Sequence, residues 1–161
     1  MLFRLNELNT ELEYEVYLCR HAGMMAALVR FITGSDWDHI VLKNNHGFLD
    51  FNYPNGHTWY SAYDLEKVPW VMESYVCTIK TTRHGLLGLY HAGFPQYSLL
   101  FNLNYILYRF FKKAPFSGWN CVKFVRRVLN RAEVEPQHLD YCSPHQYALH
   151  LKYPVDKCTG K

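Results

Sequence analysis

Cys121 stands where a thiol can act as a nucleophile. It lies in the segment Ser-Gly-Trp-Asn-Cys-Val-Lys-Phe-Val, residues 117–125, which opens a predicted helix. A helix N-terminus and a nearby imidazole both lower the pKa of a thiol, and the peptide N–H groups there can receive an oxyanion. The other cysteines fall in predicted strands, in a loop and in the C-terminal tail. The alternative is a buried core cysteine, because cysteine is among the most buried residue types.

A histidine and an acid suit the roles of base and orienting partner. His39 opens an apolar run directly after a Thr-Gly-Ser turn, and Asp50 interrupts the apolar run 48–52. A buried carboxylate is costly unless it is paired, so a histidine partner would explain it. We predict that Asp50, rather than Asn52 on the same strand face, orients His39, because a carboxylate stabilises an imidazolium better than an amide does. The alternatives are a structural histidine and an edge-strand charge that faces water.

The residue pattern predicts the elements that must position these side chains. Period-two alternation predicts strands, 3.6-residue periodicity predicts helices, and Gly, Pro and Asn mark the turns. We expect an α+β fold in a single domain, residues 1–161, with a small antiparallel sheet and helices mainly on one face. The predicted strands are 11–19, 39–42, 48–52, 57–61 and 71–81, the predicted helices are 24–32 and 117–131, the stretch 85–113 is predicted to be partly helical, and a further helix is predicted to start at 143–146.

Composition excludes several classes of protein. With 49% apolar and 17% aromatic residues, the chain is not predicted to be disordered. No apolar stretch is long enough to span a bilayer, and residues 1–10 lack the apolar core of a secretory signal. We therefore expect a cytoplasmic or virion-associated protein rather than a secreted one. The sequence does not determine the oligomeric state.

Metal and nucleic-acid binding are not expected. The cysteine count is five and no CxxC pair is present, so neither a disulfide scaffold nor a zinc ribbon is predicted. His138, Cys142 and His145 form a loose grouping without an evident fourth ligand, and we expect no metal and no cofactor. The net charge is only +3. The basic cluster at positions 123, 126, 127 and 131 is interpreted as a solvated helix face, so no nucleic-acid partner is expected.

The order of these motifs resembles that of circularly permuted NlpC-like proteins of papain fold. Residues 26–42 resemble their entry helix, turn and site histidine; Asp50 followed by Gly56 resembles their acid and glycine; and Asn-Cys-Val-Lys-Phe-Val, residues 120–125, resembles the helix start that carries their nucleophile. Ser-Pro-His-Gln at 143–146 resembles their closing helix. The resemblance covers residues 12–150 and extends to lecithin:retinol acyltransferase-like enzymes, which share the Asn-Cys dipeptide. This chain departs from the family in having Asp50 where Glu or His is usual, and residues 84–113 have no counterpart.

The resemblance implies acyl transfer through a thioester. Cys121 would attack an amide or ester carbonyl, His39 would hold the proton, Asp50 would fix the imidazole, and the Cys121 N–H would contribute to the oxyanion hole. Four further residues are predicted to bind the substrate: Trp37, Asp38, Trp119 and Asn120.

Three functions fit this resemblance, and each predicts a different site. A peptidase or amidase acting on a peptide, with peptidoglycan as the candidate, predicts an open polar groove lined by Asp36, Asp38 and Trp119. A lipid-directed acyltransferase or acyl hydrolase predicts an apolar channel, for which the candidates are Trp37, Phe94, Tyr97 and Phe101. A non-catalytic viral or phage protein that keeps the fold predicts a misaligned or blocked Cys–His pair. The cell-wall peptide hydrolase is the first expectation from the sequence.

Overall fold

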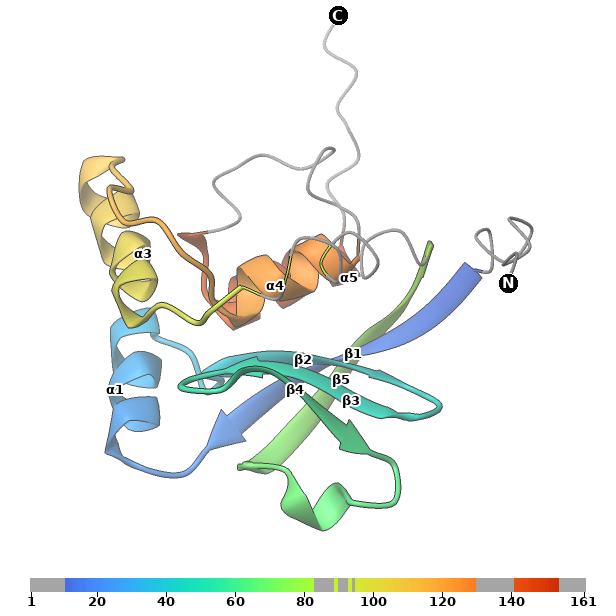
Figure 1. The fold of residues 1–161 in the computed structure, drawn as a ribbon. Coiled ribbons are helices and arrows are strands. Elements are labelled where there is room, and N and C mark those ends of the chain that lie inside the picture. Colours follow the sequence, from blue (N-terminus) through green and yellow to red (C-terminus); the bar gives the residue numbers. More distant parts are fainter. Residues whose placement is uncertain (1–10, 83–88, 90–92, 94, 130–140, 154–161) are drawn as a thin grey trace, which may run out of the picture.

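The computed structural model describes residues 11–82, 89, 93, 95–129 and 141–153, and its fold is α+β. Five strands form one antiparallel sheet in the order β4-β3-β2-β1-β5 (Figure 1). They are β1 (Glu11–His21), β2 (His39–Asn44), β3 (Gly47–Asn52), β4 (Gly56–Ser61) and β5 (Trp70–Thr82). Each strand predicted from period-two alternation is present, with ends that differ by one or two residues.

Two helices cover one face of the sheet and close the main core. These are α4 (Cys121–Val128), which packs on β2 and β3, and α5 (Pro144–Lys152), which packs on β5, β1 and β2 (Figure 1). Phe51 of β3 stacks on Phe124 of α4, with ring centroids 4.7 Å apart and planes at 9°. The opposite face carries a smaller cluster that includes Phe48 and Trp70, whose rings meet edge to face at 5.2 Å. The expected arrangement, with helices mainly on one face, is therefore confirmed for the described residues.

Two more helices lie beside the sheet rather than on it. These are α1 (Met24–Thr33) and α3 (Leu99–Phe111), which Figure 1 shows next to one another at one side of the molecule. Helix α1 ends where Gly34 adopts the left-handed conformation, φ 63°, which glycine adopts without steric cost. A short 3₁₀ turn, η2 (Leu65–Lys67), precedes β5. None of the described helices is long and apolar enough to cross a membrane.

The helix that carries Cys121 starts later than its sequence predicts. The pattern predicts a start at residue 117, but Asn120 is extended and caps the helix, its side chain accepting from the Lys123 N–H at 3.0 Å. Gly118 has φ 140°, and a Cβ there would lie 2.5 Å from the Cβ of Ser98. The late start makes Cys121 the first residue of the helix.

The prediction of a solvated basic face on α4 is wrong for Arg126. Its side chain is buried, because this part of α4 faces the core beside Val122 and Val125. The predicted start of α5 is confirmed: Ser143 and Gln146 form a capping box at 3.0 and 3.2 Å.

Candidate active site

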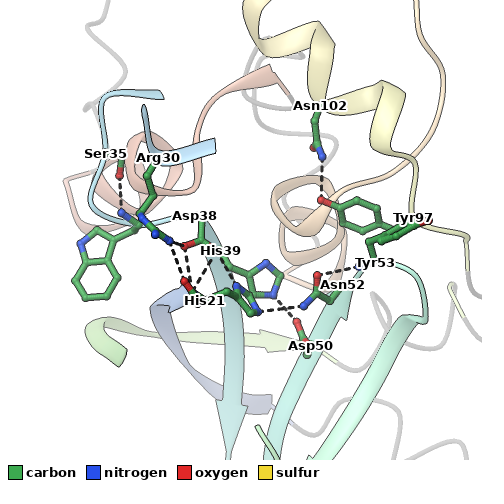
Figure 2. Close-up of polar contacts among 11 residues, drawn as sticks. His21, Arg30, Ser35, Asp38, His39, Asp50, Asn52, Tyr53, Tyr97 and Asn102 are labelled. Carbon is green, nitrogen blue, oxygen red and sulfur yellow. Dashed lines mark hydrogen bonds and ion pairs between the residues drawn. The ribbon is translucent and has the colours of Figure 1, made fainter. Parts of the chain in front are cut away.

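A buried His–Asp pair joins the start of β2 to the middle of β3. His39 is 3% exposed and Asp50 is 0% exposed, and the imidazole Nε2 contacts the Asp50 Oδ1 (Figure 2). The second carboxylate oxygen, Oδ2, has no hydrogen-bond partner among the described residues. Asn52 contacts a different histidine. The predicted contact of His39 with Asp50, rather than with Asn52, is therefore confirmed.

Cys121 meets the imidazole from the helix side of the sheet. The Cys121 side chain is 5% exposed and lies near enough to His39 to raise the pKa of the imidazole. Because Nε2 faces Asp50, Nδ1 is the ring nitrogen left for the thiol. Burial lowers the pKa of His39, but the Asp50 carboxylate and Cys121 raise it more, so the pKa lies well above the ordinary 6.5. The charged form of His39 is therefore stabilised in the folded protein.

The other described cysteines do not share this environment. Cys19 is fully buried in the cluster on the opposite face of the sheet, and burial raises the pKa of its thiol far above the ordinary range. Cys77 lies in β5, and Cys142 lies in the loop before α5, as predicted. Cys158 lies outside the described residues. Only Cys121, among the described cysteines, begins a helix beside a histidine.

A second histidine, which the sequence analysis missed, packs against the first. His21 ends β1, and its ring centroid lies 4.9 Å from that of His39, in an edge-to-face arrangement. Its Nδ1 is 2.7 Å from the Asp38 Oδ2, and the Arg30 Nη1 lies 2.5 Å from the other oxygen of Asp38 (Figure 2). Burial raises the pKa of Asp38, but the bonds from His21 and Arg30 lower it more, so the net shift is downward. Asp38, predicted to bind substrate, takes part in this network.

The hydrogen bonds around His21 hold its ring between Asp38 and Asn52. The Asn52 Oδ1 accepts from the Tyr53 N–H at 2.8 Å, so the amide nitrogen of Asn52 faces the His21 Nε2 at 3.1 Å. The ring is thus oriented with Nε2 toward Asn52 and Nδ1 toward Asp38. His21 lies two residues beyond the predicted strand 11–19, on the strand that pairs with β2.

A chain of amides links a tyrosine hydroxyl to the start of α4. The Asn120 Nδ2 donates to the Asn102 Oδ1 at 3.2 Å, and the Asn102 Nδ2 donates to the Tyr97 hydroxyl oxygen at 3.0 Å (Figure 2). Burial, followed by the charge on Cys121, raises the pKa of Tyr97, so the phenol keeps its proton. The hydroxyl oxygen accepts from Asn102, and Tyr97 lines the same cavity as Cys121. Its polar role was not anticipated from the sequence.

An apolar cavity of about 370 Å³ opens at Cys121 between α1 and α3. Its walls are mostly aliphatic and aromatic, with Asp38, Asn102 and Asn120 among the few polar groups. The lining residues are Met25, Leu28, Val29, Ile32, Thr33, Asp38, Tyr97, Leu99, Leu100, Phe101, Asn102, Leu103, Tyr105, Ile106, Asn120, Cys121, Val122, Tyr141, Cys142, Ser143 and Pro144. Tyr97 and Phe101, two of the candidates for lining an apolar channel, both line this cavity.

The predicted substrate-binding residues divide into two groups. Asn120 and Asp38 line the cavity, whereas Trp37 and Trp119 do not. Trp119 packs against the main core, with the Lys123 Nζ 5.3 Å from its ring centroid, and Trp37 also packs against that core. Asp36 does not line the cavity. Phe94 and His138 lie outside the described residues, in which no group of three metal-ligating side chains occurs.

Comparisons of the chain with models of protein families, with curated proteins and with solved structures found no match.

Proposed function

We propose that this chain is a thiol acyltransferase or acyl hydrolase of permuted papain-like, NlpC-type fold, acting on a substrate with an apolar acyl chain. The observation that carries the proposal is an apolar cavity whose lining includes Cys121, the cysteine that acts on the pKa of the buried His39 paired with Asp50. A nucleophile, a base and an orienting acid support covalent acyl transfer, and the cavity supports an apolar acyl group.

In the first half-reaction, the sulfur of Cys121 attacks the carbonyl carbon of an ester, thioester or amide, while His39 holds the thiol proton. The carbonyl oxygen becomes negative and accepts hydrogen bonds from the Cys121 N–H, which has no acceptor within the helix, and from the Tyr97 hydroxyl. Collapse of this intermediate breaks the bond to the leaving group, and His39 gives that group its proton. The product is a thioester on Cys121.

In the second half-reaction, water or an acceptor alcohol or amine attacks the thioester. His39 takes the proton of the attacking group and returns a proton to the sulfur as it leaves. Asp50 keeps its carboxylate on Nε2 throughout, so the imidazolium that forms in each half-reaction has a buried counter-ion. Hydrolase and transferase differ only in which nucleophile resolves the thioester.

The lining of the cavity favours an acyl chain over the cell-wall peptide expected first. A peptide carries a polar backbone that needs hydrogen-bonding partners along its length. The cavity offers few, and its acid, Asp38, is already paired with His21 and Arg30. An acyl chain needs no such partners, and each buried CH₂ group contributes about 0.8 kcal/mol.

The test is formation of the thioester with a series of acyl donors. The protein is incubated with saturated acyl thioesters of increasing chain length and, in parallel, with cell-wall peptides, and the attached acyl mass is located by mass spectrometry. We expect acylation of Cys121 whose rate rises with chain length until the cavity is filled. The Cys121→Ser variant is expected to lose the thioester, and Cys142→Ser, which alters another cysteine of the same cavity, is expected to retain it. Peptide cleavage without acylation by long chains would refute the proposal.

A further inference from the structure

Helix α1 is an apolar helix that buries none of its residues. Its ten residues, Met-Met-Ala-Ala-Leu-Val-Arg-Phe-Ile-Thr, include only one charge. Met24 and Phe31 are each 84% exposed, although they are among its largest apolar side chains. Exposed apolar residues scattered singly are ordinary, but an apolar helix without any buried residue indicates a surface that is covered by something else.

The end of α3 combines exposed aromatic rings with cations. Phe110 and Phe111 are 71% and 66% exposed, and Lys112 and Lys113 follow them directly and are also exposed. Neither α1 nor α3 contains an acidic residue. Aromatic rings flanked by lysines suit the boundary between acyl chains and anionic headgroups, where rings enter the apolar layer and long cationic side chains reach the phosphates.

Residues of both helices line the cavity at Cys121. Figure 1 shows α3 above α1 at one side of the molecule. We infer that they dock this protein on an anionic lipid surface, through a face defined by Met24, Phe31, Phe110, Phe111, Lys112 and Lys113. None of these six residues lines the cavity. Docking through this α1–α3 face places the walls of the cavity against the bilayer, so that an acyl chain passes from lipid to Cys121 without crossing water.

The charges favour lipid over a second copy of the chain. A two-fold symmetric interface would pair this patch with a copy of itself, and neither helix carries an acid that could pair with Lys112 and Lys113. An anionic surface supplies the missing charge, and each lysine near it contributes about 1 kcal/mol, or about fivefold in binding. The role of this docking in delivering an acyl chain rests on the proposed function. Vesicle binding is measured without turnover, so docking and acyl transfer can each fail independently.

The experiment is flotation of the full chain with two kinds of vesicle, pure phosphatidylcholine and equal parts of phosphatidylcholine and phosphatidylserine. We expect binding to the anionic vesicles that weakens as salt rises, and much weaker binding to the neutral ones. Phe31→Ser and Phe110→Ser are each expected to weaken binding about tenfold, because each removes a ring that is buried in the bound state. The double variant Lys112→Gln, Lys113→Gln is expected to weaken binding about 25-fold.

Matched controls separate docking from other effects. Tyr63→Ser removes an aromatic ring that is 98% exposed in the turn after β4, and Lys67→Gln removes an exposed cation near it; both are expected to bind as the unchanged chain does. Cys121→Ser is also expected to bind normally. Acylation of Cys121 by a short, water-soluble thioester is expected to be unchanged in Phe31→Ser, which shows that the fold and the site are intact.

Two results would overturn the inference. One is absence of binding to anionic vesicles, or binding that Phe31→Ser and Phe110→Ser leave unchanged. The other is a concentration-dependent dimer in sedimentation that Phe31→Ser dissociates, because the face would then be covered by a second copy. Acylation of Cys121 can persist in either case, and loss of acylation with intact vesicle binding would count against the proposed function instead.

Discussion

Replacing Asp50 by Asn tests whether the buried carboxylate stabilises the His39 cation. The amide keeps an oxygen that can accept from the Nε2–H, so the ring orientation is preserved, but the counter-ion is lost in a site where both side chains are almost fully buried. A hydrogen bond to a charged group contributes about 1.5–3 kcal/mol and a neutral one about 0.5–1.5. The difference is about 1–1.5 kcal/mol, or about tenfold in the population of the imidazolium that partners the thiolate.

The assay is alkylation of Cys121 by iodoacetamide as a function of pH, with the modified residue quantified by mass spectrometry. The unchanged chain is expected to react fast at mildly acidic pH, because the raised pKa of His39 keeps the imidazolium beside the sulfur. Asp50→Asn is expected to react about tenfold more slowly there, with the two rates converging as pH rises into the ordinary thiol range. Cys142 serves as an internal reference, and Asp64→Asn, which alters an exposed carboxylate, is the matched control.

The free energy of unfolding, measured against pH, compares the unchanged chain and Asp50→Asn in a second way. The direction of its pH dependence follows from the shifted pKa of His39. The folded pKa of His39 lies above its unfolded value, so the folded protein binds more protons between the two values. The stability contributed by the charged pair is thus fully present below pH 6.5 and is lost as pH rises through the raised folded value. The difference in unfolding free energy between the unchanged chain and Asp50→Asn should therefore narrow toward alkaline pH. Superimposable alkylation profiles, or a gap that widens with pH, would refute this reasoning.

Three further outcomes are expected. Tyr97→Phe should slow acylation of Cys121 by about 10²-fold, as loss of an oxyanion donor does, while donor binding stays nearly constant; an equal rate would remove Tyr97 from the oxyanion hole. Asp38→Asn should lower the unfolding free energy at neutral pH by about 1–3 kcal/mol. Because the folded pKa of Asp38 is depressed, the difference in unfolding free energy between the two proteins should close as pH falls through that pKa. Urea titrations at several pH values measure this difference. Ile106→Trp should narrow the cavity and shift the preference in the acyl series toward shorter chains; an unchanged preference would place the chain elsewhere.

Alternation and turn residues in the sequence predicted all five strands and the helix 24–32, because side chains on one face must enter the core together. The same local logic predicted Cys121 at the opening of a helix and Asp50 as the partner of His39. A carboxylate inside an apolar strand needs a nearby cation, and the hairpin that joins β2 to β3 supplies one over a short distance along the chain. These features depend on neighbours in sequence, or on a single adjacent strand.

What the sequence missed depends on segments that only the tertiary structure brings together. His21, Arg30 and Asp38 come from β1, α1 and the loop before β2, and their network forms because β1 pairs with β2 and returns the loop to the strand end. Arg126 is buried because α4 lies flat on the sheet, which helical spacing of charges cannot reveal. The cavity at Cys121 requires α1 and α3 to stand beside the sheet rather than on it. The position of α1 and α3 depends on the fact that α4 and α5 already cover the apolar face of the sheet. Local sequence patterns do not determine which helices take that face.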